Sequence, residues 1–145
     1  VIFHDLKNDR TNNFDFALEE VVQFEGETGP YVQYTHARAM SILRKANHTV
    51  DTQAAFSLTD DDAWEVLKLI ENYPNVVRFA EEKCEPSAIA KFVINLAQAF
   101  NKYYAHTKVL VEDEAFNSRI ALVQTTASIL KQGLALLGVA APDEM

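Results

Sequence analysis

Apolar residues recur every three or four positions along most of the chain, which is the spacing of one face of an α-helix. The repeat is clearest in residues 87–108, where Ile89, Phe92 and Leu96 share one face, and in residues 112–137. No segment shows the sustained alternation of apolar and polar residues that is typical of a half-buried strand. The pattern therefore predicts an all-α fold, a helical bundle.

Proline, glycine and capping residues predict where the helices begin and end. Pro30 suits the first turn of a helix, whereas Pro74 is expected to break one. Thr59 before three aspartates predicts an N-cap, and Gly138 predicts a C-cap. The predicted helices cover residues 13–24, 30–46, 60–73, 75–83, 87–108 and 112–137, the last with an acidic first turn at 112–114.

The composition predicts a single acidic globular domain. The chain has 145 residues, of which 48% are apolar, and a formal net charge of −8, which argues against a nucleic-acid binder and against DNA as a partner. The acids are unevenly distributed, because residues 31–50 and 87–111 contain three cations each and no acid. If these two helices are neighbours, the bundle has a neutral-to-positive face; burial of both helices would exclude acids equally well.

The helix predicted for residues 30–46 carries two distinct stripes. One, with Val32 and Ala39, is expected to face the core, and the other presents Tyr31, Tyr34 and Arg38. Tyrosine and arginine together can stack on unpaired bases and bind phosphate, as recognition of single-stranded RNA requires. Tyrosines on a helix also serve as half-buried packing residues, and the spacing alone leaves both interpretations open.

Several kinds of chemistry lack their motifs. The single cysteine, Cys84, can form neither an internal disulfide nor a zinc site, which favours the cytoplasm. The four histidines lack metal-ligand spacing, and the four glycines form neither a P-loop nor a dinucleotide fingerprint. No signal peptide or membrane span is predicted, so we expect no membrane partner. Because residue 1 is Val1 rather than methionine, we expect the chain to be part of a longer protein.

One segment resembles a known family. The run FEGETGPYVQYTHARAMSILRK, Phe24 to Lys45, closely resembles the junction between the catalytic and anticodon-binding domains of arginyl-tRNA synthetases, which are class I enzymes. Residues 96–110, residues 118–138 and the terminal APDEM are also similar to that family. The resemblance implies that residues 24–145 are the helical, DALR-type anticodon-binding domain and that residues 1–23 end the stem of the catalytic domain.

The resemblance also implies a partner and a site. The partner is the tRNA for arginine, whose middle anticodon base, a cytosine, is a major identity element in the family. The implied contact residues are Phe24, Glu27, Tyr31, Tyr34, Arg38, Arg44, Tyr104 and Met145. Arg44 projects outside the tyrosine stripe of its helix.

The resemblance assigns catalysis to another part of the enzyme. The ATP-binding signatures of the class are absent from this sequence, so we expect no catalytic residue, metal or cofactor here. ATP with Mg²⁺ belongs to the longer arginine–tRNA ligase, through the catalytic domain of the same chain. The alternative function is a helical protein–protein interaction module, suggested by the net charge and by the apolar stripes.

Overall fold

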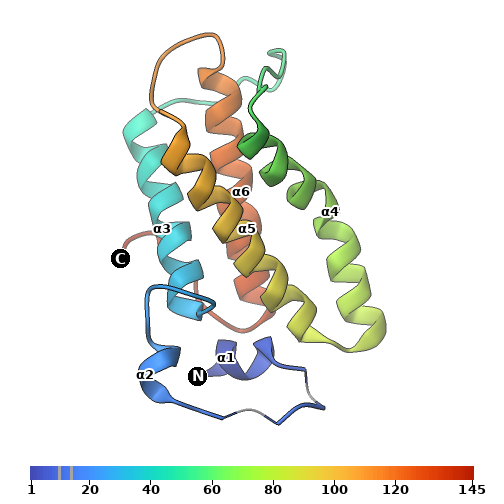
Figure 1. The fold of residues 1–145 in the computed structure, drawn as a ribbon. Helices are drawn as coiled ribbons and strands as arrows, with labels where there is room; N and C mark the ends of the chain where they lie inside the picture. Colours follow the sequence, from blue (N-terminus) through green and yellow to red (C-terminus); the bar gives the residue numbers. More distant parts are fainter. Residues whose placement is uncertain (10, 14) are drawn as a thin grey trace.

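The computed structural model describes residues 1–9, 11–13 and 15–145, and within these ranges it contains helices and no strand. The helices are α1 (Ile2–Lys7), α2 (Leu18–Val21), α3 (Gly29–Ala46), α4 (Asp61–Lys83), α5 (Pro86–His106) and α6 (Phe116–Leu136). The last four lie side by side and alternate in direction along the chain (Figure 1). The prediction of an all-α helical bundle is confirmed.

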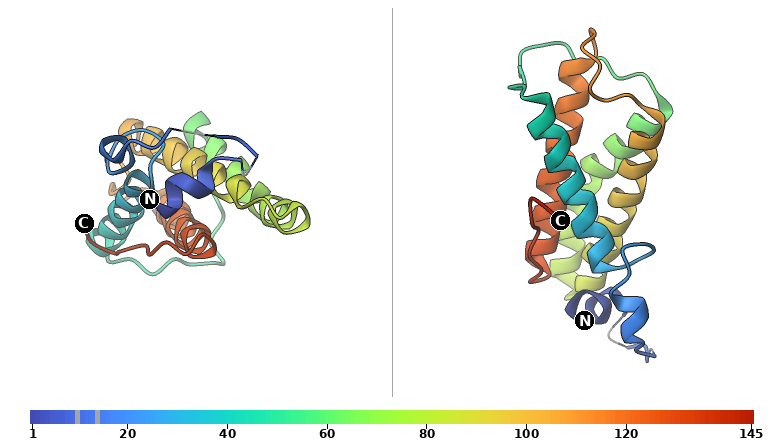
Figure 2. Two further views of the ribbon diagram at one scale, coloured as in Figure 1. Left: turned by 90° about the horizontal axis from the view of Figure 1, so that it is seen from below. Right: turned by 90° about the vertical axis from the view of Figure 1, so that its left-hand side faces the viewer.

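Helix α5 is the centre of the core. It packs against α3, α4 and α6, and its Leu96, Phe100 and Tyr103 are fully buried. The short helix α1 lies across the lower end of the bundle (Figures 1 and 2), where the side chain of Phe3 is buried against α3. Gly29 permits this approach, because a Cβ at that position would lie 3.0 Å from the Cβ of Phe3.

The capping predictions hold with one shift. Helix α3 has Thr28 as its N-cap, whose hydroxyl accepts from the backbone N–H of Tyr31 at 3.2 Å, and Pro30 lies in its first turn. Helix α4 is capped by Asp60, which accepts from the N–H of Ala63 at 2.8 Å. The predicted N-cap, one residue earlier, was therefore wrong, since the carboxylate of Asp60 is the group that reaches a free amide of the first turn.

The predicted break at Pro74 does not occur. Residues 61–83 form one helix with Pro74 in its interior, and the ribbon of α4 continues through it (Figure 1). A proline removes one intrahelical hydrogen bond, but packing against α5 holds both halves in line. The ring of Tyr73, next to the proline, stacks on Phe92 of α5 with centroids 5.3 Å apart.

The first predicted helix, residues 13–24, is mostly wrong. Only the single turn α2 forms, and Phe14, which belonged to that prediction, lies outside the described residues. The side chains of Phe16 and Leu18 are exposed, so they provide little of the tertiary packing that a short helix needs for stability.

Helix α6 begins at Phe116, later than predicted, so the acids at 112–114 precede it rather than form its first turn. Asp113 instead accepts a 2.7 Å hydrogen bond from Arg119, a buried side chain that also donates to the backbone carbonyls of Val109 and Val111. This arginine therefore holds the α5–α6 loop against the bundle. The C-cap of α6 is Leu137, and the predicted cap Gly138 is the next residue, with φ +70°, the left-handed conformation that glycine adopts where a helix ends.

Candidate nucleic-acid interface

A pocket of about 420 Å³ lies between α3, the end of α5 and the C-terminal tail. Its volume is in the range of sites for small organic groups, about 300–1,000 Å³. Five of the eight predicted contact residues line it: Tyr34, Arg38, Arg44, Tyr104 and Met145. The structure therefore brings together side chains that lie more than 100 positions apart in the sequence.

The guanidinium of Arg38 lies between two aromatic rings. Its Cζ is 4.9 Å from the ring centroid of Tyr34, one turn earlier on α3, and 5.6 Å from that of Tyr104 on α5. Both distances are within the range of a cation–π contact. Tyr34 and Tyr104 are 40% and 41% exposed, so each ring keeps a surface on which a planar group can stack.

Asn101 holds the same arginine from the inner side of the pocket. Arg38 Nη1 donates to the side-chain oxygen of Asn101 at 2.6 Å, and the Asn101 amide donates to the hydroxyl of Tyr31 at 3.0 Å. Asn101 is not among the contact residues predicted from the sequence. It lies three residues before Tyr104 and thus on the same helix face, which is the signal that could have identified it.

Phe24 extends the aromatic surface outward from the pocket. Its ring meets that of Tyr34 edge to face, with centroids 6.3 Å apart, and it is 58% exposed. It belongs to the loop that precedes α3, whose Gly26 has φ +81°, a left-handed turn that glycine adopts without strain. Phe24 and Tyr34 thus form a continuous aromatic surface that leads to Arg38.

The C-terminal tail forms one wall of the pocket. It runs back along α3, where Gln33 donates to the carbonyl of Ala140 at 2.7 Å and the buried His36 donates from Nδ1 to that of Pro142 at 3.0 Å. Arg44 donates to the carbonyl of Asp143 at 3.1 Å and lies 3.5 Å from the carboxylate of Glu144. These contacts explain how Arg44, outside the tyrosine stripe, reaches the same pocket.

Besides Phe24, two further predicted contact residues do not line this pocket. Glu27, in the loop before α3, forms an ion pair with Lys7 of the N-terminal segment at 3.7 Å. Tyr31 is half-buried, and its hydroxyl accepts a hydrogen bond from the amide of Asn101. The face predicted from spacing therefore divides into an inner tyrosine, Tyr31, and an outer one, Tyr34.

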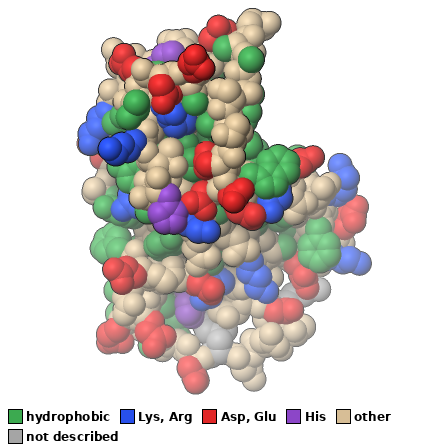
Figure 3. Space-filling view, turned by 45° about the horizontal axis from the view of Figure 1, so that its top comes forward, with side chains coloured by type: hydrophobic (Ala, Val, Ile, Leu, Met, Phe, Trp, Pro, Cys, Tyr) green, Lys and Arg blue, Asp and Glu red, His purple; other side chains and the backbone are tan. Residues whose placement is uncertain are grey.

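The charge around the pocket is mixed. The two acid-free helices, α3 and α5, are in contact, and Arg38, Arg44 and Lys45 all line the pocket. Glu144 from the tail adds one negative charge. In the view of Figure 3, acidic and basic side chains alternate over the loop end of the bundle, with no wide area of one sign. The pocket therefore has only a small local excess of positive charge.

The side chains that line the pocket suit the binding of a planar polar group. It offers planar rings, a guanidinium and two further cations, which are groups that stack on bases, donate to base oxygens and contact phosphates. Among the residues the structure describes, no group of three or more His, Cys, Asp or Glu could hold a metal ion. Over the same ranges, no helix has the length and apolar character needed to cross a membrane.

Comparisons with known proteins show what this chain is similar to. Residues 32–145 match the family described as the DALR anticodon binding domain. The arginine–tRNA ligase of Enterococcus faecalis is 65% identical over 100% of this chain and 26% of its own length. This chain thus spans about a quarter of that relative.

Two solved structures share the fold. The arginyl-tRNA synthetase of Thermus thermophilus matches with a TM-score of 0.88 at 35% identity, over 99% of this chain and 26% of that one. That of Plasmodium falciparum matches with a TM-score of 0.91 at 26% identity, over the same shares of the two chains. The family match begins at residue 32, in the first turn of α3, and runs to the C-terminus, so it includes every pocket residue. The chain belongs to the DALR anticodon binding domain family.

Proposed function

We propose that this chain recognises the anticodon loop of the tRNA for arginine, as part of an arginine–tRNA ligase. The observation that carries the proposal is the guanidinium of Arg38 held between Tyr34 and Tyr104 inside the pocket. This arrangement can accept one unstacked base, and the names of the matched ligases indicate which tRNA supplies it. The middle anticodon base, a cytosine, is the base that we assign to the pocket.

The proposed mode of binding uses the two types of side chain differently. A base that leaves the loop stacks on the exposed surface of Tyr34 or Tyr104, a contact worth about 1–3 kcal/mol. The guanidinium of Arg38 has five N–H donors, of which one is bonded to Asn101, so others can donate to O2 and N3 of a cytosine. Arg44 and Lys45, at the pocket, are placed to contact phosphates.

We assign attachment of arginine to the part of the longer protein outside this chain. The matched relatives are about four times as long, and all four glycines here serve turns or helix contacts rather than a phosphate-binding loop. Residues of this chain therefore do not fit ATP, and both ATP and Mg²⁺ are assigned to the catalytic domain. We also assign the protein to the cytoplasm, where an exposed free thiol such as that of Cys84 stays reduced.

Residues 1–23 are proposed as the connection to the catalytic domain. Several apolar side chains of this segment are more than half exposed, namely Val1, Ile2, Phe16, Leu18 and Val22. Apolar residues in such a concentration mark a surface that another domain covers. Phe3 and Val21 of the same segment are buried in this chain, so the connection is anchored at both ends.

The proposal is tested by titrating the chain with an RNA hairpin that carries the anticodon loop of an arginine tRNA. We expect Tyr34→Ala and Arg38→Ala each to weaken binding by about tenfold or more, the loss of a stack or of a charged hydrogen bond. Trp64→Ala and Arg78→Ala, which remove an exposed aromatic residue and an exposed cation from α4, are the matched controls. Equal affinity of all four variants and the unmodified chain would refute the assignment.

In the longer ligase, the same two site variants should raise the KM for tRNA and leave arginine activation nearly unchanged. This separation follows because the pocket touches the anticodon and not the reacting groups.

A helical protein–protein interaction module is not favoured, since the family match and the pocket both indicate RNA.

A further inference from the structure

We propose that Asn101 is a positioning residue, which orients the guanidinium of Arg38 for its contact with the base. This inference rests on the proposed function and adds a residue that does not line the pocket itself. Asn101 lies on α5, 63 positions after Arg38, and is half-buried between α3 and α5. Hydrogen bonds to Arg38, Tyr31 and Thr35 fix the orientation of its amide.

The orientation of the Asn101 amide follows from its partners. The hydroxyl of Thr35 donates its only proton to the carbonyl of Tyr31 at 2.9 Å, so it can only accept from Asn101. The amide nitrogen of Asn101 donates to this hydroxyl at 2.8 Å and to the hydroxyl of Tyr31 at 3.0 Å. Both N–H donors of the amide are thereby used.

The amide oxygen must then face Arg38, which can only donate. The 2.6 Å bond from Arg38 Nη1 to this oxygen holds one edge of the guanidinium against α5. The rings of Tyr34 and Tyr104 also contact the guanidinium, with centroids 4.9 Å and 5.6 Å from its Cζ. Because one edge is fixed, the remaining N–H groups face the pocket in a constant direction, which is the preorganisation that selective binding requires.

The positioning role predicts a loss of selectivity as well as of affinity. In Asn101→Leu, which has similar volume and no acceptor, we expect the hairpin with cytosine at the middle anticodon position to bind about tenfold more weakly. The preference for that hairpin over one with uridine at the same position should shrink in parallel. Asn95→Leu, the same substitution on the exposed side of α5, is the matched control and should change neither value.

A double-variant cycle separates positioning from general stability. In the Arg38→Ala background, Asn101→Leu should cause no further loss of hairpin affinity, because the side chain that it positions is gone. Tyr31→Phe removes one anchor of the amide while keeping the ring, and should cause a smaller loss of about two- to threefold. An equal loss from Asn101→Leu in both backgrounds would overturn the inference.

A measurement without RNA tests the positioning directly. NMR resonances of the Arg38 guanidinium should be resolved and slowly exchanging in the unmodified chain and in Asn101→Asp, which keeps an acceptor. In Asn101→Leu, these resonances should average, because the guanidinium has lost its acceptor and can rotate. If the hairpin fails to bind the unmodified chain, the proposed function falls and the role in recognition falls with it. If the hairpin binds and Asn101→Leu keeps the cytosine preference, only the positioning role is overturned.

Discussion

Two consecutive tyrosines of α5 have opposite environments. Tyr104 is exposed beside Arg38, whereas Tyr103 is completely buried in the core. The hydroxyl of Tyr103 has no hydrogen-bond partner among the residues that the structure describes, and burial, with the nearby charge of Asp60, raises its pKa above the usual range for tyrosine. A buried, unpaired hydroxyl costs about 1–3 kcal/mol. This residue is therefore not optimised for stability.

Tyr103→Phe should raise the free energy of unfolding by about 1 kcal/mol, since it removes the unpaired hydroxyl and keeps the ring. Urea denaturation followed by circular dichroism measures the change. Tyr73→Phe is a suitable control, because the ring of Tyr73 is only partly buried. A decrease in stability for Tyr103→Phe would show that the hydroxyl has a partner in solution.

At this scale, the sequence predicted neighbours along one helix and missed partners from other elements. Tyr34 and Arg38 are one turn apart, so helical spacing alone places them together. Asn101 contacts Arg38 and Glu144 contacts Arg44 from distant parts of the chain. Local spacing contains no information on such contacts. The resemblance identified Tyr104 and Met145, but the spacing of residues did not.

Among the helices, α5 and α6 make an unusually close approach at Gly133. A Cβ placed at this glycine would lie 2.4 Å from Cγ1 of Val93, a distance that forces one of the two helices to move. Valine has a stiff side chain and cannot easily rotate away. The small residue is therefore required by the packing of α5 on α6.

Gly133→Ala should lower the free energy of unfolding by about 1–3 kcal/mol through overpacking, although alanine favours helix formation more than glycine. Chemical denaturation provides the measurement. Gln124→Ala, on the exposed side of the same helix, should change stability by less than about 0.5 kcal/mol. An increase in stability for Gly133→Ala would contradict the close approach.

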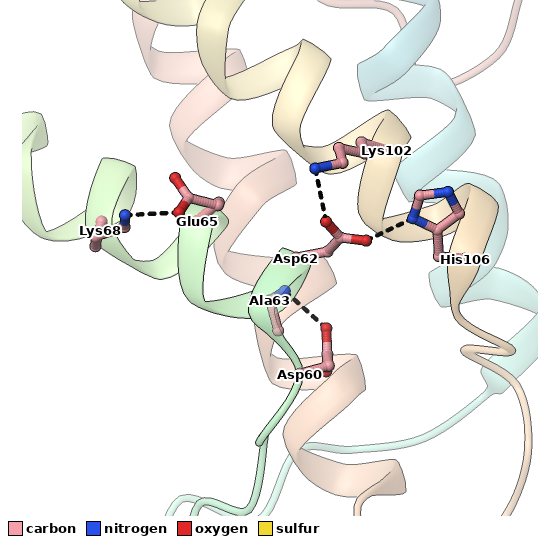
Figure 4. A network of polar contacts seen from close by, with 7 residues as sticks. All are labelled: Asp60, Asp62, Ala63, Glu65, Lys68, Lys102 and His106. Atoms are coloured by element: carbon pink, nitrogen blue, oxygen red, sulfur yellow. Dashed lines mark hydrogen bonds and ion pairs between the residues drawn. The ribbon is translucent and has the colours of Figure 1, made fainter.

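Asp62 of α4 makes polar contacts with two side chains of α5. Its carboxylate lies between Lys102 and His106, with contacts of 3.0 Å and 2.6 Å (Figure 4). These partners lower its pKa from 3.8, as the hydrogen bond from Arg119 lowers that of Asp113. A carboxyl group whose pKa is lower in the folded state than in the unfolded state stabilises the fold at pH values above its unfolded pKa. This stabilisation is lost as the pH falls through its folded pKa.

The stability of the chain should consequently decrease as the pH falls below about 4, where these carboxylates take up protons. Replacing both with asparagine, as Asp62→Asn with Asp113→Asn, should lower stability at neutral pH and flatten the decrease in acid. Thermal unfolding between pH 2 and pH 7 measures both effects. Asp61→Asn serves as the control, and an unchanged acid slope in the double variant would contradict the assignment.

Three of the four long helices were predictable from the sequence, whereas the continuity of α4 and the extent of the short α2 were not. Helices α3, α5 and α6 each have several turns of apolar repeat, which the spacing reveals within a few residues of their ends. The continuity of α4 through Pro74 depends on its packing against α5. Helix α2 is short because apolar side chains in and beside it are exposed rather than packed. Tertiary contacts of this kind leave no local pattern.

For the whole molecule, the net charge of −8 and the mixed signs on the face seen in Figure 3 imply that the proposed RNA binding depends on a few contacts. With two cations, Arg44 and Lys45, placed for phosphates, the logarithm of hairpin affinity should fall with the logarithm of salt concentration with a slope of about −1 to −2. Titrations at several salt concentrations determine this value. A much steeper slope would indicate a larger phosphate-binding surface elsewhere on the chain.

Recognition of the anticodon loop through this pocket is tested by mapping where the hairpin binds on the chain. A titration of the isotope-labelled chain with the anticodon hairpin, followed by NMR, reports on every backbone amide. We predict that the largest shifts occur at the pocket, at Tyr34, Arg38 and Ser41 on α3 and at Tyr104 and Leu110 beside it. Shifts confined to α4 or to its groove with α5, with the pocket unchanged, would contradict the account.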